Sequence, residues 1–316
     1  GNKVAQNAFG VGCWGYSDNN IITGNNITYG DAGVYGNNHS NDNTISRNNI
    51  SAASFEGIYL AASANNIIQS NSLFGNGFYG IYLGISCSNS VILGNNITNC
   101  SLDGIYIRNS SNCTVSGNNM ANDRYGFYLA VVSHCTISKN NITDSYDGGF
   151  YLASSSYCVI SGSNITSNGY GFDLDRSNYN TFSENDVRNS TYYGVRLFLS
   201  AYNTFFHNNF NNTQQVNSDG SLNAWWDKGY PPRGNYWSDY LTKYPNATEI
   251  DHTGIGDTAY EIDANNTDYY PFIIPYKTTP PTIITTSPEN KTYTVNASIP
   301  LTFTVNESAT WIGYSL

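Results

Sequence analysis

The sequence contains few charged residues and no long apolar run. Only 11% of its 316 residues are charged, and no apolar stretch approaches the roughly 18 residues of a membrane-spanning helix. Acidic residues outnumber basic ones by 23 to 13, which gives a formal net charge of −10. This balance argues against nucleic acid or an anionic membrane surface as a partner. We expect from the first residues of the chain that no signal peptide remains at the start.

Helical 3.6-residue spacing is missing as well, and short repeats take its place. The stretch CTISKNNIT from Cys135 recurs as NTISRNNIS from Asn43, SVILGNNIT from Ser90 and CVISGSNIT from Cys158. A second marker, glycine followed by two alternating apolar residues, recurs every 22 to 24 residues. The marked glycines are Gly10, Gly33, Gly57, Gly80, Gly104, Gly126, Gly149, Gly171 and Gly194.

This period predicts an all-β fold, namely a right-handed single-stranded parallel β-helix of about nine coils. Each repeat carries three short alternating strands, which is typical of one β-helix turn. Leucine-rich repeats have a similar length, but their consensus is absent. Aligned repeats then form columns of side chains about 4.8 Å apart. Four apolar columns, which begin at Ile22, Ile27, Val34 and Leu60, predict a narrow continuous core.

Two further columns are rich in asparagine. One runs from Asn25 through Asn118 to Asn208, and we expect it to turn a corner of each coil in a left-handed conformation while its stacked amides join neighbouring coils. The other contains Cys113, Cys135 and Cys158 among asparagines. We therefore interpret these cysteines as members of a ladder; a stacked core of this length needs no disulfide framework.

The periodicity stops after Thr213, and we divide the chain into residues 1–213 (parallel β-helix), 214–277 (aromatic C-terminal cap) and 278–316 (linker and partial β-sandwich). The repeats, together with GNYWSDY at 234–240 and GIGDTAYEIDANNTDYYP at 254–271, resemble NosD-like β-helix proteins, a group common among archaeal surface proteins. The resemblance implies the fold, and it also suggests a periplasmic role in copper delivery.

The last segment looks like the beginning of an immunoglobulin-like domain, with strands such as 301–305. Its length of about 38 residues is too short for the roughly seven strands of a complete sandwich. Either the sequence ends partway through that domain, or another copy completes the sheet by strand addition, which would assemble the protein head to tail.

A tyrosine stripe and a pair of carboxylates are the candidate sites for polysaccharide. Tyr35 and the predicted carbohydrate-binding residues Tyr59, Tyr82, Tyr106, Tyr128 and Tyr151 share one outward column. They either bind sugar rings or stack on one another for stability. The stripe ends at Asp173, with Asp175 two residues on and Arg196 in the next coil. Two carboxylates about 7 Å apart suit an inverting glycosidase, whereas Asp173 and Arg196 also suit an exposed ion pair.

The remaining candidate sites are for metal ions and for glycosylation. Thiolates such as those of the three cysteines beside His134 suit Cu(I), but buried cysteine usually behaves as a small hydrophobe, and His134 should point to the opposite face. Asp251, Asp257, Glu261 and Asp263 in the cap form a candidate calcium site, or simply an acidic loop; no cofactor is otherwise indicated. The candidate glycosylation sites are Asn38, Asn99, Asn109, Asn189, Asn211, Asn246, Asn265, Asn290, Asn296 and Asn306.

These observations favour an extracellular structural or adhesive glycoprotein, a rigid rod in a surface layer, sheath or filament. The coils vary by at most two residues, so no long loops wall a groove of the kind that a polysaccharide-cleaving enzyme uses. A polysaccharide-binding or polysaccharide-cleaving protein is the first alternative, and a periplasmic copper-related protein is the second.

Overall fold

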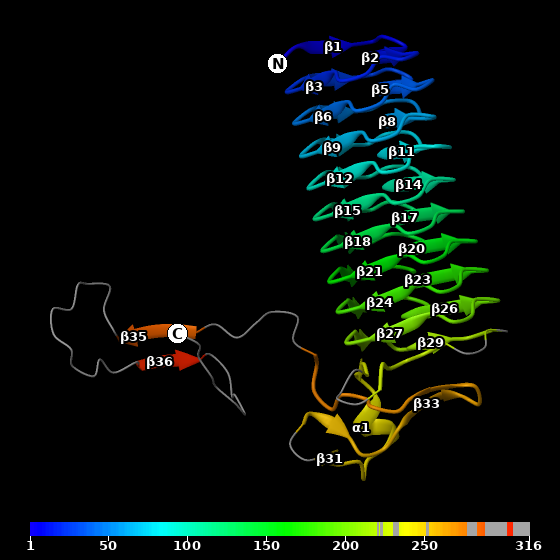
Figure 1. Ribbon diagram of the computed structural model, residues 1–316, viewed down its shortest axis with the longest axis vertical. Helices are drawn as coiled ribbons and strands as arrows, with labels where there is room; N and C mark the ends of the chain where they lie inside the picture. The colour runs from blue at the N-terminus through cyan, green and yellow to red at the C-terminus, as the bar shows by residue number, and fades with distance from the viewer. Residues whose placement is uncertain are drawn as a thin grey trace. The chain divides into compact units, whose positions relative to one another are not determined.

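The fold is a right-handed parallel β-helix followed by a small cap (Figure 1). The computed structural model describes residues 1–219, 221, 224–229, 234–250, 253–276, 283–287 and 302–305. The chain divides into two units, Gly1–Tyr276 and Lys277–Leu316. The coils and the cap belong to the first unit. Within the described residues the one helix has four residues, so no helix there is long enough to cross a membrane.

Three parallel sheets run the length of the coils, and every strand pairs with the equivalent strand one coil away. Sheet A has eleven strands: β1 (Lys3–Ala5), β4 (Asn26–Thr28), β7 (Asn49–Ser51), β10 (Ser72–Phe74), β13 (Asn96–Thr98), β16 (Asn119–Ala121), β19 (Asn141–Thr143), β22 (Asn164–Thr166), β25 (Asp186–Arg188), β28 (Asn209–Asn211) and β30 (Tyr236–Trp237). Sheet B has ten: β2 (Phe9–Trp14), β5 (Ala32–Asn37), β8 (Glu56–Leu60), β11 (Ile81–Leu83), β14 (Ile105–Arg108), β17 (Tyr125–Ala130), β20 (Gly148–Ala153), β23 (Tyr170–Asp175), β26 (Val195–Phe198) and β29 (Val216–Asn217). Sheet C has nine: β3 (Ile21–Thr23), β6 (Thr44–Ser46), β9 (Ile67–Gln69), β12 (Val91–Leu93), β15 (Thr114–Ser116), β18 (Thr136–Ser138), β21 (Val159–Ser161), β24 (Thr181–Ser183) and β27 (Thr204–Phe206).

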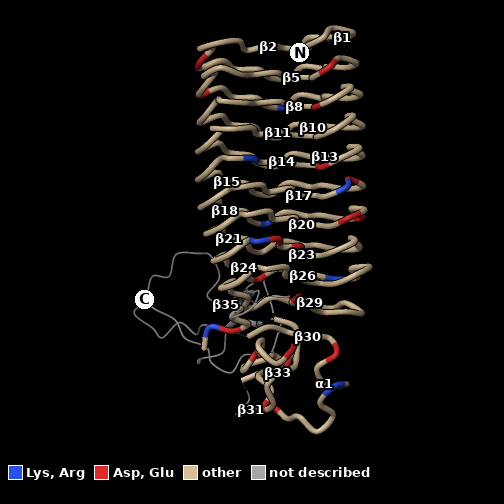
Figure 2. The backbone as a smooth tube through the Cα atoms, turned by 90° about the vertical axis from the view of Figure 1, so that its right-hand side faces the viewer, with Lys and Arg blue, Asp and Glu red and all other residues tan. Residues whose placement is uncertain are grey.

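The core lies between the three sheets, where the apolar columns meet. Ile92, Ile97 and Ile105, one residue from each sheet of a single coil, are all fully buried. Because the strands are only a few residues long, each coil adds little core by itself, and stability comes from stacking coil on coil. Figure 2 shows how few charged residues the coils carry.

The predicted asparagine ladder is confirmed, with one correction. Asn95 donates both its backbone N–H and its side-chain amide to Oδ1 of Asn118, each at 2.9 Å. Asn118 in turn donates its side-chain amide to the carbonyl of Ile92 inside the coil, at 3.1 Å. However, the left-handed corner residue is the one before each ladder asparagine, for example Gly94 with φ 58° and Gly117 with φ 65°. The asparagine therefore laces the coils, while its neighbour turns the corner.

The cap continues the β-helix by one coil before it closes the end. Asn208 donates to Oδ1 of Asn235, and β28 pairs with β30. Trp226 and Trp237 take the next places in two core columns, stacked on Phe205 and Phe210 at 4.4 and 4.8 Å between ring centroids. The aromatic residues thus form the last layer of the core.

The remaining cap elements fold over that layer. They are α1 (Tyr240–Lys243), β31 (Glu249–Ile250), β32 (Ile255–Gly256), β33 (Tyr260–Asp263) and β34 (Asn266–Asp268), with β31–β32 and β33–β34 paired antiparallel. Asp268, which is fully buried, accepts a hydrogen bond from Nε1 of Trp237 at 2.9 Å.

In the second unit, β35 (Ile283–Ser287) pairs antiparallel with β36 (Thr302–Val305). The remainder of the predicted immunoglobulin-like segment lies outside the described residues, so that assignment stays a prediction.

Candidate functional site

The outward face of sheet B gathers the predicted tyrosines into one ladder. Tyr59 pairs with Tyr82, and Tyr82 with Tyr106, in direct register. The column continues through Tyr128 and Tyr151 before it changes to Asp173 and Arg196. All these tyrosines are half-buried. The strands thus place polar and aromatic side chains from many coils along a single surface.

The orientation of the rings limits how a ligand can meet the ladder. Tyr59 and Tyr82 are parallel within 9°, with ring centroids 5.0 Å apart, and Tyr106 and Tyr128 within 12° at 4.7 Å. Stacked rings cover one another's faces, so they present edges and hydroxyl groups rather than flat surfaces. Between Tyr82 and Tyr106 the rings turn by 75°, which breaks the stack. Burial raises the pKa of Tyr151 to about 12, so this hydroxyl keeps its proton and remains a hydrogen-bond donor at neutral pH.

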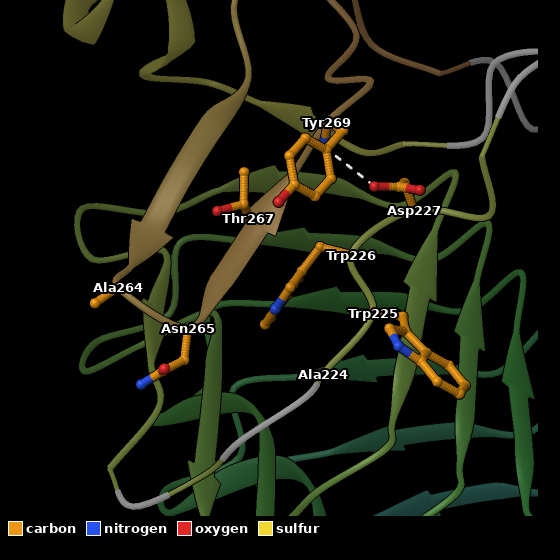
Figure 3. Close-up of a pocket in the computed structure, with 8 residues that line it drawn as sticks. All are labelled: Ala224, Trp225, Trp226, Asp227, Ala264, Asn265, Thr267 and Tyr269. Atoms are coloured by element: carbon orange, nitrogen blue, oxygen red, sulfur yellow. Dashed lines mark hydrogen bonds between the residues drawn. The ribbon is translucent and has the colours of Figure 1, made fainter.

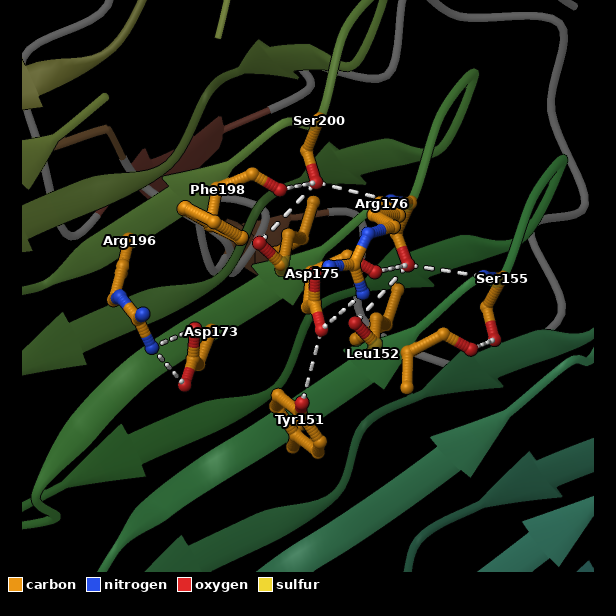
Figure 4. Close-up of polar contacts among 12 residues, drawn as sticks. Tyr151, Leu152, Ser155, Asp173, Asp175, Arg176, Arg196, Phe198 and Ser200 are labelled. Carbon is orange, nitrogen blue, oxygen red and sulfur yellow. Dashed lines mark hydrogen bonds and ion pairs between the residues drawn. The ribbon is translucent and has the colours of Figure 1, made fainter. Parts of the chain in front are cut away.

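At the lower end of the ladder Arg196 covers Asp173 (Figure 4). The two residues pair directly across β23 and β26, and Nη1 of Arg196 donates to both carboxylate oxygens at 3.1 and 3.2 Å. The side chain of Asp173 is 3% exposed and that of Arg196 is 35% exposed. Burial raises the pKa of Asp173 to about 6, against the opposing effect of the guanidinium. The pair is therefore not the exposed ion pair that its register suggests.

A second pair of the same kind lies higher on this face. Arg124 donates through Nε and Nη2 to the two carboxylate oxygens of Asp103, at 3.1 and 3.2 Å. The exposures are again unequal, 33% for Arg124 and 0% for Asp103. Burial also raises the pKa of Asp103 to about 6. Column alignment does not predict this pair, because the register places Asp103 level with Tyr125 and not with Arg124.

Each arginine also contacts an aromatic ring. Arg124 lies 5.3 Å from the ring centroid of Tyr125, and Arg196 lies 5.7 Å from that of Tyr170. The two groups therefore share one arrangement, which we name the Asp–Arg–Tyr cluster. It consists of a buried carboxylate, a guanidinium that the carboxylate holds in place, and a tyrosine whose ring the guanidinium contacts. The two clusters stand three coils apart, or about 14 Å along the axis.

Asp175 does not form an open acid–base pair with Asp173. One of its oxygens accepts hydrogen bonds from Arg176 at 3.3 Å and from the hydroxyl of Tyr151 at 3.5 Å, and the other is buried without a partner. A glycosidase needs two carboxyl groups that touch the sugar on opposite sides. Here Asp173 lies under Arg196, so the arrangement suits binding better than cleavage.

Beside Arg124 the surface is hollowed. A cavity of about 430 Å³ is bordered by Ser101, Asn122, Asp144, Tyr146 and Asp147, in addition to Arg124. Its inner wall includes Asp123, which is 2% exposed and has one carboxylate oxygen without a hydrogen-bond partner. Burial raises the pKa of Asp123 to about 8. The hollow brings further hydroxyl, amide and carboxylate groups to the edge of sheet B.

The candidate calcium residues do not converge. Asp257 binds Thr248, accepting its backbone N–H at 3.1 Å and its hydroxyl at 2.7 Å, and so joins the ends of β31 and β32. Asp263 caps the turn of another hairpin through the N–H of Asn265, at 2.7 Å. Glu261 is exposed, and these three residues form no group that could hold a metal ion. Asp251 lies outside the described residues.

The candidate glycosylation sites are mostly accessible where the structure describes them. Asn109 is half-buried. The exposed sites are Asn38, Asn99, Asn189, Asn211, Asn246 and Asn265. Asn290, Asn296 and Asn306 lie outside the described residues.

Comparison with known proteins agrees with this architecture. The sequence matches the model of a family described as periplasmic copper-binding protein (NosD), over residues 1–131 and 86–242. No curated protein matches it.

Solved structures share the fold at low identity. The periplasmic alginate epimerase AlgG is 16% identical with a TM-score of 0.51, over 65% of this chain and 59% of that one. A double mutant of AlgG is 14% identical with a TM-score of 0.56, over 71% of each chain. The A-module of the Azotobacter vinelandii mannuronan C-5 epimerase AlgE4 is 14% identical with a TM-score of 0.51, over 64% of this chain and 68% of that one. This chain thus spans about three fifths of the first of these proteins, and the likeness shows the fold alone.

The family description implies copper, but the described residues do not fit a copper site. No three His, Cys, Asp or Glu side chains among them form a group that could hold a metal ion. Cys113, Cys135 and Cys158 are at most 1% exposed, and each thiol donates to the backbone carbonyl two residues earlier at 3.5 to 3.7 Å. His134 is exposed and stacks on the ring of Tyr157. The thiols therefore act as ladder members in the core.

Proposed function

We propose, from the premise that the chain belongs to the NosD family, that it binds an acidic polysaccharide along the outward face of sheet B. The observation that carries this proposal is the Asp–Arg–Tyr cluster, which occurs twice on this face: a buried aspartate fixes an arginine, and the arginine contacts a tyrosine ring. A guanidinium matches the geometry of a carboxylate, and one that is already fixed in place loses less freedom when it binds. The edges of the tyrosine ladder would add hydroxyl groups along the same line.

A gain in stability does not explain the two Asp–Arg–Tyr clusters. Burying an ion pair is often neutral or unfavourable compared with apolar side chains, because desolvation offsets the attraction. Most other coils fill the column of Asp173 and Arg196 with tyrosine, so the fold itself has no need of charge there. Arg196 uses only Nη1 for Asp173, which leaves Nε and Nη2 for a ligand. Arg124 leaves Nη1.

The other candidate functions have less support. Asp173 is covered by Arg196, which disfavours cleavage, and the thiols are buried, which disfavours a copper role. A structural rod outside the cell, head-to-tail assembly and glycosylation stay predictions. Among proteins of the same fold, the epimerases of alginate and mannuronan act on polysaccharides, which is consistent with the proposal.

Calorimetric titration with a uronic-acid oligosaccharide, and with a neutral oligosaccharide of equal length, tests the proposal. The variant Asp173→Asn/Arg196→Gln keeps a hydrogen-bonded pair but removes both charges. A matched control is Asp186→Asn/Arg188→Gln, which neutralises an ion pair of 2.6 Å on sheet A. We expect the first variant to bind the acidic ligand about tenfold more weakly or worse, and the control to bind as the parent does. Absence of acidic-ligand binding by the parent, or equal binding by both variants, would contradict the proposal.

A further inference from the structure

A second aromatic ladder lies on the corner between sheets B and C. It consists of His134, Tyr157, Tyr179 and Tyr202, one residue from each of four successive coils, and we name it the corner ladder. Neighbouring rings are parallel within 13°, with centroids 5.0 to 5.3 Å apart. The three tyrosines are 39% to 52% exposed. The ladder therefore presents ring edges and hydroxyl groups in a strip on the surface, separate from the tyrosines of sheet B.

The fold does not require aromatic residues at this corner. All four residues have left-handed backbones, with φ between 56° and 59°. In the five preceding coils the same column holds Asn19, Asp42, Asn65, Asn89 and Asn112. Asparagine and aspartate adopt this conformation readily, whereas a bulky residue adopts it rarely. Stacking gains roughly what the strained backbone loses, so stability alone gives no reason to prefer tyrosine.

The corner ladder leads to a cavity at the junction of coil and cap. Tyr202 meets Trp225 edge to face, with ring centroids 6.4 Å apart. Trp225, which is 55% exposed, lines a cavity of about 290 Å³ together with Tyr269, which is 65% exposed. Figure 3 shows Trp226 between these two rings, and its side chain is fully buried.

Polar groups complete the cavity. Asn265 and Thr267 line it with an amide and a hydroxyl group. Asp227 accepts the backbone N–H of Tyr269 at 3.1 Å and that of Gly229 at 2.8 Å, which holds Tyr269 at the rim. A carboxylate can accept about four hydrogen bonds, so Asp227 still has acceptor capacity. None of the described residues that line the cavity is a lysine or an arginine.

We propose that this cavity and the corner ladder form a second carbohydrate-binding site, specific for neutral glycans. The exposed rings of Trp225 and Tyr269 suit the apolar face of a sugar, and the polar side chains that line the cavity suit its hydroxyl groups. The corner ladder adds ring edges and tyrosine hydroxyl groups along the same line. The carboxylate of Asp227, with no cation among the described lining residues, would repel a uronic acid. One sugar occupies the cavity beside Trp225, and the following sugars lie over the corner ladder, which reaches about 19 Å from Trp225 to His134. This site differs from the face of sheet B in both position and ligand charge.

Titration with a panel of neutral glucan and mannan oligosaccharides, short and long, tests the proposal. Trp225→Ala removes the cavity wall, and Tyr179→Asn restores the asparagine that the fold accepts in the same column. Tyr146→Ala is the control, because Tyr146 is an 81% exposed tyrosine on another corner. The melting temperature of each variant verifies that it folds.

We expect Trp225→Ala to weaken binding of every neutral ligand by about tenfold or more, and Tyr179→Asn to weaken binding of long ligands only. Tyr146→Ala and Asp173→Asn/Arg196→Gln should bind neutral ligands as the parent does. The proposal fails if the parent binds no ligand of the panel, or if Trp225→Ala leaves the affinity unchanged. Self-association that Tyr179→Asn abolishes would also overturn it, because the ladder would then have another copy as its occupant. Acidic-ligand binding, measured in parallel, reports on sheet B independently.

Discussion

Oδ1 of Asn235 accepts both the backbone N–H of Asn208, at 3.1 Å, and its side-chain amide, at 2.9 Å. The two residues are 27 positions apart, yet the contact repeats the one that joins most pairs of neighbouring coils, with an exception at Ser163, where only backbone N–H groups donate along the ladder. Through the contact between Asn208 and Asn235 the asparagine ladder passes from the last regular coil into the cap. These hydrogen bonds, together with the pairing of β28 and β30, connect the coils to the cap within one unit.

The ladder should therefore be a main source of stability. Replacing Asn118 with alanine leaves two buried donors of Asn95 without their acceptor, and we expect a loss of roughly 3 kcal/mol in the free energy of unfolding. Asn119→Ala is the control, since this neighbour is half-buried in the outer column and should cost under about 1 kcal/mol. Urea denaturation measures both, and equal losses would refute the distinction.

The buried carboxyl of Asp123 should make stability depend on pH. Its pKa is raised to about 8 by burial, so the folded protein keeps a proton that the unfolded chain releases near pH 4. The resulting stability is complete below about pH 4 and is lost as the pH rises towards 8. Asn76, Asn168 and Asn212 fill the same column, and each accepts the equivalent backbone N–H.

We therefore expect Asp123→Asn to raise the free energy of unfolding by roughly 3 kcal/mol at about pH 8.5, and by little at about pH 4. Denaturation curves across this range measure the difference. Asp144→Asn, at an exposed position of the same hollow, serves as the control. A parallel pH profile for parent and Asp123→Asn would show that Asp123 ionises normally.

Loss of Arg196 alone should be more damaging than loss of an exposed arginine. Arg196→Ala leaves the carboxylate of Asp173 buried and unpaired, at a cost of about 3 kcal/mol near neutral pH. Arg188→Ala breaks a pair in which both side chains are partly exposed and should cost under about 1 kcal/mol. Thermal and urea denaturation report the difference, and an unaffected Arg196→Ala protein would mean that Asp173 is solvated.

The six cysteines should be inert in the native protein. All are free and buried, so we expect a thiol reagent to modify them only after unfolding. Cys135→Asn introduces the residue that Asn43, Asn66 and Asn180 supply in the same column of other coils, so we expect this variant to fold normally. Stoichiometric Cu(I) binding by the native protein that Cys135→Asn abolishes would contradict the interpretation of these thiols as core.

The coils could be predicted from the sequence because one period fixes the register of every column. The extra coil in the cap also has a signal, since Gly234, Asn235 and Trp237 repeat the pattern of Gly24, Asn25 and Ile27. The interval of 27 residues between Asn208 and Asn235 obscures that signal.

The sites were less predictable, because side chains contact one another across columns. Arg124 reaches Asp103 diagonally, which column alignment does not represent. Asp173 is buried because the side chain of Arg196 lies over it, and the sequence pattern does not show which side chains cover one another. The cavity at Trp225 joins residues about 40 positions apart, in a part of the chain without periodicity.

A crystal structure with a bound uronic-acid oligosaccharide would test the central proposal most directly. We predict that the ligand lies along sheet B, with its carboxylates within hydrogen-bonding distance of the guanidinium groups of Arg124 and Arg196. A ligand bound on another surface, with both arginines contacting only Asp103 and Asp173, would contradict it.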